Sequence, residues 1–408
     1  MASGESHGVD RRSVLFGLGG LATGVVAGAA GWNATAGGRL SNVDPETSDP
    51  AAVDPASEGA AGAAASDGAG APVNASGRYQ PGIHRPSTPQ RHGLVMVLDI
   101  AGDDLSWLGA LGDAILGIAD GSHADVTRVA PDGVGDLSVT VGLGPRLIST
   151  VGPELPGAAD LPAFADDDGI PLERRGGDVM LAAYGSDPTI LRPVLELLLT
   201  QMTAATPRWE QRGFRGPGTS TVARNPFGFL DGIIVPRTDD EFDDNVWIQE
   251  GPLAGGTVCV LRRLRLDIVG FQSRSRDEQE AIIGRKAGTG APLSGGAPTA
   301  QIDLRSKTPE GQYTVPAHAH ARAAHPSFTG SELMLRRGYT FDDGLVDGVA
   351  DAGLLFMCYQ RSLRTFTATQ QRLDELDALS EFSTPTGSAT FLILPGFSRE
   401  SPLGSTLR

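Results

Sequence analysis

Three of the chain's seven histidines, His318, His320 and His325, fall within the eight-residue stretch HAHARAAH. Imidazole is a preferred ligand of both zinc and haem iron, so this spacing favours a metal site. On a β-strand, the His-x-His pair would place both rings on one face, as a zinc site could use them. The alternative is that these histidines lie on the surface of an alanine-rich segment and bind nothing. The spacing by itself leaves both interpretations open.

Two further segments carry residues that could take part in chemistry. The segment NPFGFLDG, residues 225–232, places Asp231 between two glycines. By itself this pattern is typical of a turn in which the aspartate caps a helix. The segment LMLRRGY, residues 333–339, ends an apolar run on two arginines, which by itself is typical of a solvated strand end. Neither segment indicates a reaction on its own.

The charge balance and the cysteines narrow the classes of function. The 408 residues contain 33 Lys and Arg against 49 Asp and Glu, a formal net charge of -16. A nucleic acid is excluded as the main partner, because a polyanion requires a basic surface. Cys259 and Cys358 both lie in apolar runs, which favours buried structural thiols over a disulfide. No Cys-x-x-Cys pair occurs, so a thiolate metal site is excluded.

Residues 1–36 have the pattern of an export signal. Arg11 and Arg12 directly precede an uncharged stretch, 13–38, that is rich in Gly and Ala and less apolar than a lasting membrane anchor. We expect a cleaved twin-arginine signal peptide and a periplasmic, cell-envelope or extracellular protein, with no stable membrane span after cleavage. An uncleaved anchor is the alternative. Residues 37–76 contain almost no large apolar side chains and are expected to be a disordered linker.

The residues that could take part in a reaction must be positioned by the helices and strands of a folded region that starts near residue 77. Buried strands are predicted for six apolar runs, at 94–100, 137–143, 178–184, 257–268, 354–360 and 389–394. Helices are predicted for three segments with apolar residues at helical spacing, at 104–118, 187–202 and 363–379. The second half repeats the order of the first. We therefore predict an α+β fold of two ferredoxin-like domains with antiparallel sheets, residues 77–240 and 241–408.

Taken together, the motifs resemble those of the dye-decolorizing (DyP-type) haem peroxidases, a family of the dimeric α/β-barrel type. The resemblance rests on three patterns: Gly-x-x-Asp-Gly at 228–232, His320-x-Arg322 followed by Pro326, and LMLRRGY, whose Arg336 follows His320 by sixteen residues. It spans residues 78–398. It is strongest to the exported branch that includes the deferrochelatases of bacterial iron uptake, and a twin-arginine signal is typical of that branch.

The resemblance implies one haem b per chain, held mainly by the C-terminal half. His320 matches the proximal histidine that binds the iron, Asp231 the distal aspartate and Arg336 the distal arginine. A carboxylate near the iron can move a proton between the oxygens of a bound peroxide, and a guanidinium can stabilise the negative charge that develops. The implied activity is reduction of hydrogen peroxide through a ferryl intermediate, with oxidation of dye-like or phenolic reductants.

The resemblance also implies further haem contacts. The residues expected to contact haem are Gly232, Ile233, Ile234, Arg285, Arg322, His325, Pro326, Ser327 and Arg336. Glu332 is a candidate acceptor for the second N-H of the proximal histidine.

Two alternative functions remain. The same pocket could extract iron from haem, as the name deferrochelatase implies, with components of an iron-uptake system as partners. The histidine cluster could also belong to a zinc hydrolase, although the sequence offers no convincing set of carboxylate partners. The sequence leaves open whether the chain forms a homo-oligomer.

Overall fold

The order of the strands shows how each half of the chain is built. In the first half, four antiparallel strands lie in the order β4-β1-β3-β2. They are β1 (His92–Ile100), β2 (Ser138–Leu143), β3 (Val179–Gly185) and β4 (Ala205–Phe214). Helix α1 (Trp107–Ala119) lies between β1 and β2 in the chain, and α4 (Leu191–Leu199) lies between β3 and β4. This is the βαββαβ order of a ferredoxin-like unit.

The second half repeats this order. Its strands are β8 (Thr257–Leu266), β9 (Leu335–Arg336), β10 (Tyr339–Val346), β11 (Val349–Gln360) and β12 (Ser383–Ile393). They are arranged as β12-β8-β11, with β9 and β10 both paired to β11. The connecting helices are α6 (Ile268–Gln272), α7 (Arg276–Ile283) and α10 (Leu363–Leu376). The predicted α+β fold with two ferredoxin-like antiparallel sheets is confirmed.

The two sheets join at both edges. Leu143 of β2 pairs with Leu392 of β12, and Phe214 of β4 pairs with Thr340 of β10. Because β10 also pairs with β11, the strands form a closed ring. Both halves therefore contribute to one sheet, and the domain boundary near residue 240 stays a prediction.

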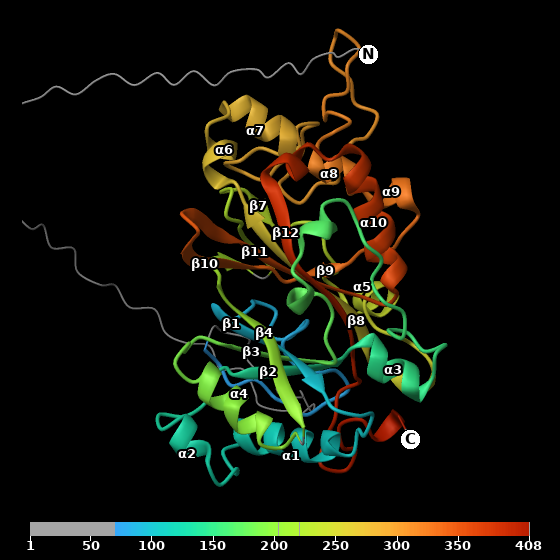
Figure 1. The fold of residues 1–408 in the computed structure, drawn as a ribbon. Coiled ribbons are helices and arrows are strands. Elements are labelled where there is room, and N and C mark those ends of the chain that lie inside the picture. The colour runs from blue at the N-terminus through green and yellow to red at the C-terminus, as the bar shows by residue number, and fades with distance from the viewer. Residues whose placement is uncertain (1–69, 203, 220, 408) are drawn as a thin grey trace, which may run out of the picture. The chain divides into compact units, whose positions relative to one another are not determined.

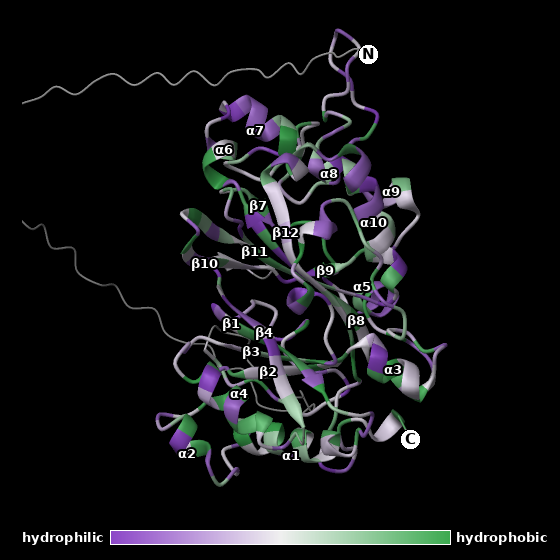
Figure 2. Ribbon diagram, in the orientation of Figure 1, coloured by the Kyte–Doolittle hydropathy of each residue, from purple (hydrophilic) through white to green (hydrophobic). Residues whose placement is uncertain are grey.

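Strand β1 shows why its sequence is a continuous apolar run. Val95 and Val97 face the interior of the ring and pack against residues from both halves, such as Phe391. Leu94 and Met96 point to the opposite face, where they pack against α1 and α4. Alternate side chains of a strand leave opposite faces, so a strand covered on both faces has no polar face. The helix that covers this face is apolar in turn: in Figure 2, α1 carries much apolar colour, whereas α7 is mostly polar.

The two cysteines lie on neighbouring strands of this sheet. Cys259 of β8 pairs with Tyr359, the residue after Cys358 in β11. Both thiols are buried and free. They belong to different clusters, Cys259 inside the ring and Cys358 on its outer face. The prediction of buried structural thiols is confirmed.

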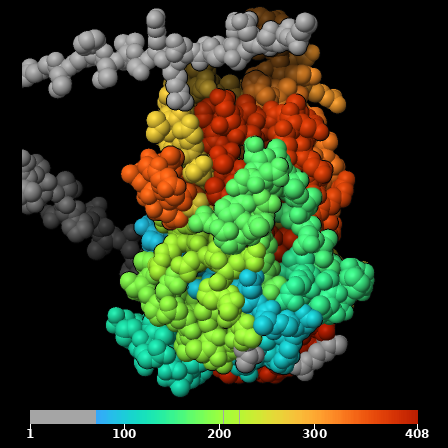
Figure 3. Space-filling view, viewed as in Figure 1, coloured from blue at the N-terminus to red at the C-terminus, as the bar shows by residue number. Residues whose placement is uncertain are grey.

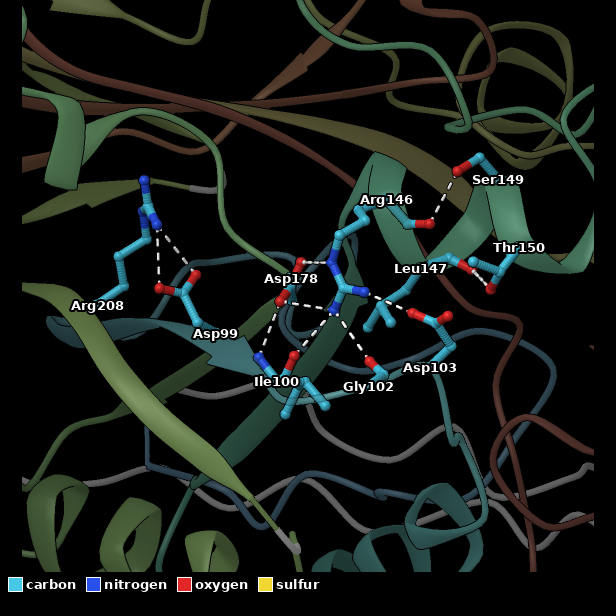
Figure 4. Close-up of polar contacts among 10 residues, drawn as sticks. All are labelled: Asp99, Ile100, Gly102, Asp103, Arg146, Leu147, Ser149, Thr150, Asp178 and Arg208. Atoms are coloured by element: carbon cyan, nitrogen blue, oxygen red, sulfur yellow. Dashed lines mark hydrogen bonds and ion pairs between the residues drawn. The ribbon is translucent and has the colours of Figure 1, made fainter.

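A polar network ties together the ends of the first-half strands (Figure 4). Arg146 donates to both carboxylate oxygens of Asp178, at 2.7 and 2.8 Å, and to Asp103 at 2.6 Å. Asp178 also accepts the backbone N-H of Ile100 at 2.8 Å. Burial alone would raise the pKa of Asp178, but the bonds from Arg146 and Ile100 lower it overall. The network stabilises the end of β1 beside the start of β3.

The computed structural model describes residues 70–202, 204–219 and 221–407 (Figure 1). The expected signal peptide and the expected linker up to residue 69 lie outside the described residues. Residues 70–76 form no helix or strand, and Ala75 is buried in the core. In these described stretches, no helix combines the length and the apolar character needed to cross a membrane.

Candidate active site

A cavity of about 380 Å³ lies on the outer face of the second-half sheet. Its floor is formed by side chains that alternate along two paired strands, Leu264 and Leu266 of β8 and Leu354 and Phe356 of β11. Phe366 of α10 is among the side chains that complete its apolar walls. A volume of this size is typical of a site for a cofactor or small ligand.

His320 lies in the wall of this cavity, at the start of α8 (His320–Ala323). Its Nδ1-H donates to Oδ2 of Asp377 at 2.7 Å. Asp377 is itself buried, directly after α10, and its Oδ1 accepts the backbone N-H of Leu379. The backbone N-H of Ala378 donates to the carbonyl of His318, which holds the segment after α10 against the segment before α8. The ring is therefore fixed by one nitrogen, which leaves Nε2 available to a ligand in the cavity.

Electrostatics at His320 combine opposing effects. Burial by itself lowers the pKa of an imidazole, because it disfavours the charged form. The carboxylate of Asp377, with a contribution from Asp231, outweighs this effect and raises the pKa of His320 above its ordinary 6.5. The influence of Asp231 on His320 means that the two groups are close enough to interact.

Glu332 does not have the role expected from the sequence. Its carboxylate accepts from Arg361 at 3.2 Å and from the hydroxyl of Thr365 at 2.9 Å. The acceptor for His320 is Asp377, which is 57 residues away in the chain and was missed by sequence reasoning. No local motif marks Asp377, because its role depends on how the end of α10 packs against α8.

Asp231 and Arg336 form a pair in the wall of the same cavity. Asp231 ends β7 (Leu230–Asp231) and Arg336 ends β9. The Arg336 Nη2 donates to Asp231 Oδ1 at 3.3 Å, and its Nη1 donates to the carbonyl of Ile234 at 3.1 Å. Burial would raise the pKa of Asp231, but Arg336 and the backbone N-H of Gly232 lower it below its ordinary 3.8. The carboxylate is therefore ionised at neutral pH.

Gly232 shapes the backbone beside this pair. Its φ is +76°, a conformation that side chains disfavour. A Cβ there would also lie 2.3 Å from the carbonyl oxygen of Thr221, which is too close for any side chain. The glycine therefore allows the loop to turn directly after Asp231 and to donate its N-H to the carboxylate at 2.6 Å.

The other predicted residues divide into two groups. Those that line the cavity are Ile233, Ile234, Arg285, His325 and Pro326. Those outside its lining are Gly232, Arg322 and Ser327. His318, the other histidine of the His-x-His pair, is exposed and also lies outside the lining.

Arg285 and His325 line the cavity, and Arg322 lies close enough to influence His325. Arg322 is buried, donates to the carbonyl of Leu304 and lies 4.2 Å from the ring centre of Tyr313. Burial, together with the charges of Arg322 and Arg285, lowers the pKa of His325. Arg285 itself donates to three backbone carbonyls. Arg322 therefore contributes charge without lining the cavity.

A loop from the first half closes one side of the cavity, and we call residues 161–175 the strap. Ala165 of the strap lines the cavity, and its N-H donates to Asp374 of α10 at 3.0 Å. Asp167 forms a buried ion pair with Arg262 of β8 at 2.6 Å. Figure 3 shows this green segment lying across the red C-terminal segments. The sequence analysis expected the haem to be held mainly by the second half and missed this contribution from residues 161–175.

Comparison with protein families and known proteins gives a consistent result. Residues 222–398 match the family described as Dyp-type peroxidase, C-terminal. The chain is 34% identical to the dye-decolorizing peroxidase of Thermobifida fusca, over 95% of each chain. It is 30% identical to a deferrochelatase of Escherichia coli, over 68% of this chain and 70% of that one. The structure is similar to that of DtpA from Streptomyces lividans in an oxyferrous complex, with a TM-score of 0.77, 31% identity and coverage of 84% and 99%.

Proposed function

This chain belongs to the Dyp-type peroxidase family, and from that premise we propose which residues carry its haem-dependent reduction of hydrogen peroxide. In this proposal His320 binds the iron of a haem b, and Asp231 and Arg336 act on the peroxide. The observation that carries it is that one apolar cavity is lined both by a histidine anchored to a buried carboxylate and by an ionised aspartate paired with an arginine.

The residues of the cavity suit a haem. A bare metal ion needs several protein ligands, and within the described residues no three His, Cys, Asp or Glu side chains are grouped to hold one. A porphyrin supplies four nitrogen ligands of its own, so a single histidine is sufficient. The floor of Leu and Phe side chains suits a flat apolar ring. The positive charges of Arg285, which lines the cavity, and of the nearby Arg322 suit the negatively charged propionates, and His325, whose pKa is lowered, lies beside them as a neutral ring.

The chemistry follows from the states of the side chains. The haem, when bound, supplies the iron at which peroxide is activated. Asp231 is ionised, so it can accept a proton from the inner oxygen of hydrogen peroxide and return it to the outer oxygen. Arg336 is held beside Asp231 by the carbonyl of Ile234, where its permanent charge stabilises the negative charge on the departing oxygen. The apolar walls limit competition from water.

Asp377 is proposed to tune the iron through His320. A carboxylate that accepts the Nδ1-H makes the imidazole more electron-rich and favours the ferric state. In Asp377→Asn this effect is weakened, so we expect haem to be retained and its midpoint potential to rise by about 60 mV, which is tenfold in the one-electron equilibrium. Spectroelectrochemical titration measures the shift. Glu375→Gln, an exposed change near the end of α10, which Asp377 directly follows, is the control. An unchanged potential in Asp377→Asn would refute the tuning role.

The second candidate function is release of iron from haem, which the similarity to deferrochelatases favours. The haem-loaded protein should be mixed with hydrogen peroxide and a dye, and both oxidised dye and porphyrin fluorescence recorded. We expect many dye molecules oxidised per protein, with the haem retained. Accumulation of iron-free porphyrin in proportion to the protein, without dye turnover, would favour iron release instead.

Export by the twin-arginine route is also part of the proposal. It is supported by Arg11 and Arg12 directly before the uncharged stretch 13–38. Replacement of both arginines by lysine is expected to keep the full-length chain inside the cell. Unchanged export of that variant would contradict the proposal.

A further inference from the structure

The contact between Asp231 and Arg336 is too long to hold the pair together by itself. Arg336 Nη2 donates to Asp231 Oδ1 at 3.3 Å, whereas a hydrogen bond between charged groups is usually about 2.7–2.9 Å long. Both residues belong to two-residue strands, β7 and β9, at the edges of their sheets. Such short strands supply few backbone hydrogen bonds, so contacts from elsewhere must help to set the distance between the two side chains.

Arg215 connects the two backbone segments that carry this pair. It directly follows β4, in the first half of the chain. Its Nη1 donates to the carbonyl of Gly338, two residues after Arg336, and its Nη2 donates to the carbonyl of Thr221, both at 3.0 Å. One planar guanidinium therefore joins the segment after β9 to the segment before β6 (Val222–Arg224).

Thr221 links this restraint to Asp231. Its hydroxyl donates to the carbonyl of Gly232 at 2.9 Å. In β6, which follows it, Ala223 pairs with Asp231 of β7. The carbonyl oxygen of Thr221 is also the atom that a Cβ at Gly232 would strike. The position of Thr221 therefore determines where the chain turns after Asp231.

The Arg215 side chain is itself held in place. Its Cζ lies 5.8 Å from the ring centre of Tyr339, within the range of a cation–π contact. Tyr339 is buried, and its hydroxyl donates to the carbonyl of Gln90 at 3.1 Å. Arg215, Asp231 and Arg336 all line one small cavity of about 30 Å³, so the three residues are neighbours. Arg215 does not line the large cavity, so any effect on the reaction must pass through the pair.

We propose that Arg215 is a positioning residue that sets the distance between Asp231 and Arg336. The inference rests on the proposed roles of that pair in peroxide reduction. Two N-H groups of one rigid guanidinium can bond two carbonyls at once, whereas the lysine ammonium is a compact point charge on a flexible stem. Positive charge alone at residue 215 is therefore insufficient.

The reaction of the full-length, haem-loaded protein with hydrogen peroxide tests the proposal. We expect Arg215→Gln and Arg215→Lys each to keep the parental haem content and to react about 10²-fold more slowly, since small misplacements of reacting groups have effects of this size. The later oxidation of the dye should keep its parental rate. Arg212→Gln, an exposed change on β4, is the control and should react with peroxide at the parental rate. In the Arg336→Leu background, Arg215→Gln should have little further effect, because the pair is already broken.

Crystal structures of the haem-loaded variants give a readout that does not use peroxide. In Arg215→Lys we expect Asp231 Oδ1 and Arg336 Nη2 to separate beyond about 4 Å, the limit of an ion pair. A retained contact of 3.3 Å would overturn the proposal. A parental rate or loss of haem in Arg215→Lys would also overturn it, as would additive effects of Arg215→Gln and Arg336→Leu. If Arg336→Leu alone reacted at the parental rate, the peroxidase role of Arg336 would fail, and the distance would still test Arg215.

Discussion

Replacement of His320 by alanine is expected to abolish stable haem binding and, with it, at least a thousandfold of the peroxidase activity. The iron would lose its one protein ligand, and the apolar walls that remain hold the ring without fixing the metal. The absorbance ratio of the Soret band to the protein band measures haem content after purification. The protein should still fold, because the His320 side chain lies at the cavity surface and is 39% exposed there.

The matched control is His318→Ala. His318 is two residues away and chemically identical, but it is exposed and absent from the cavity lining. We expect this variant to keep the parental haem content and activity. If His318→Ala lost its haem and His320→Ala retained it, the assignment of the iron ligand would be wrong.

The second large effect is expected at Asp231 and Arg336. Asp231→Asn removes the proton acceptor, and Arg336→Leu removes the positive charge beside the departing oxygen, while His320 and Asp377 remain in place. We expect each variant to bind haem at the parental level and to react with hydrogen peroxide about 10² to 10⁴ times more slowly. Stopped-flow spectroscopy of the haem bands gives the second-order rate constant.

Exposed charges elsewhere provide the controls for this experiment. Asp244→Asn and Arg212→Leu change the same side-chain types at the surface and should react at the parental rate. Parental rates in both Asp231→Asn and Arg336→Leu would exclude their proposed roles. If Asp231→Asn reacted slowly and Arg336→Leu reacted at the parental rate, the proton-transfer role of Asp231 would stand and the role of Arg336 would be refuted.

The pH dependence of the same reaction tests the state of Asp231. Burial raises the pKa of this carboxylate, but Arg336 and the Gly232 N-H lower it below the ordinary 3.8, so the ionised form persists as the pH falls to that value. The rate should decline only below this pH. In Arg336→Leu the main stabilising charge is absent, so the decline should move to higher pH. An unchanged acid limb in that variant would show that Arg336 does not control the ionisation.

Much of the fold could be predicted because the signals were local. The apolar run of β1 predicted a strand buried on both faces, and the repeated order of strands and helices predicted two ferredoxin-like units. Strands β4 and β10 escaped prediction, and β9 was expected only as the solvated end of a strand. Their sequences carry charged residues, and they are strands because neighbouring strands supply partners for their backbones, β1 for β4 and β11 for β9 and β10.

The sequence by itself determined the family, the two-unit fold and the candidate residues His320, Asp231 and Arg336, because motifs record residue types at fixed spacing. Only the tertiary structure decided what surrounds them. It replaced Glu332 by Asp377 as the partner of His320, and it brought the strap from the first half against the cavity. These contacts join residues far apart in the chain, and their geometry depends on the packing of α8, α10 and the closed sheet, which no local spacing records.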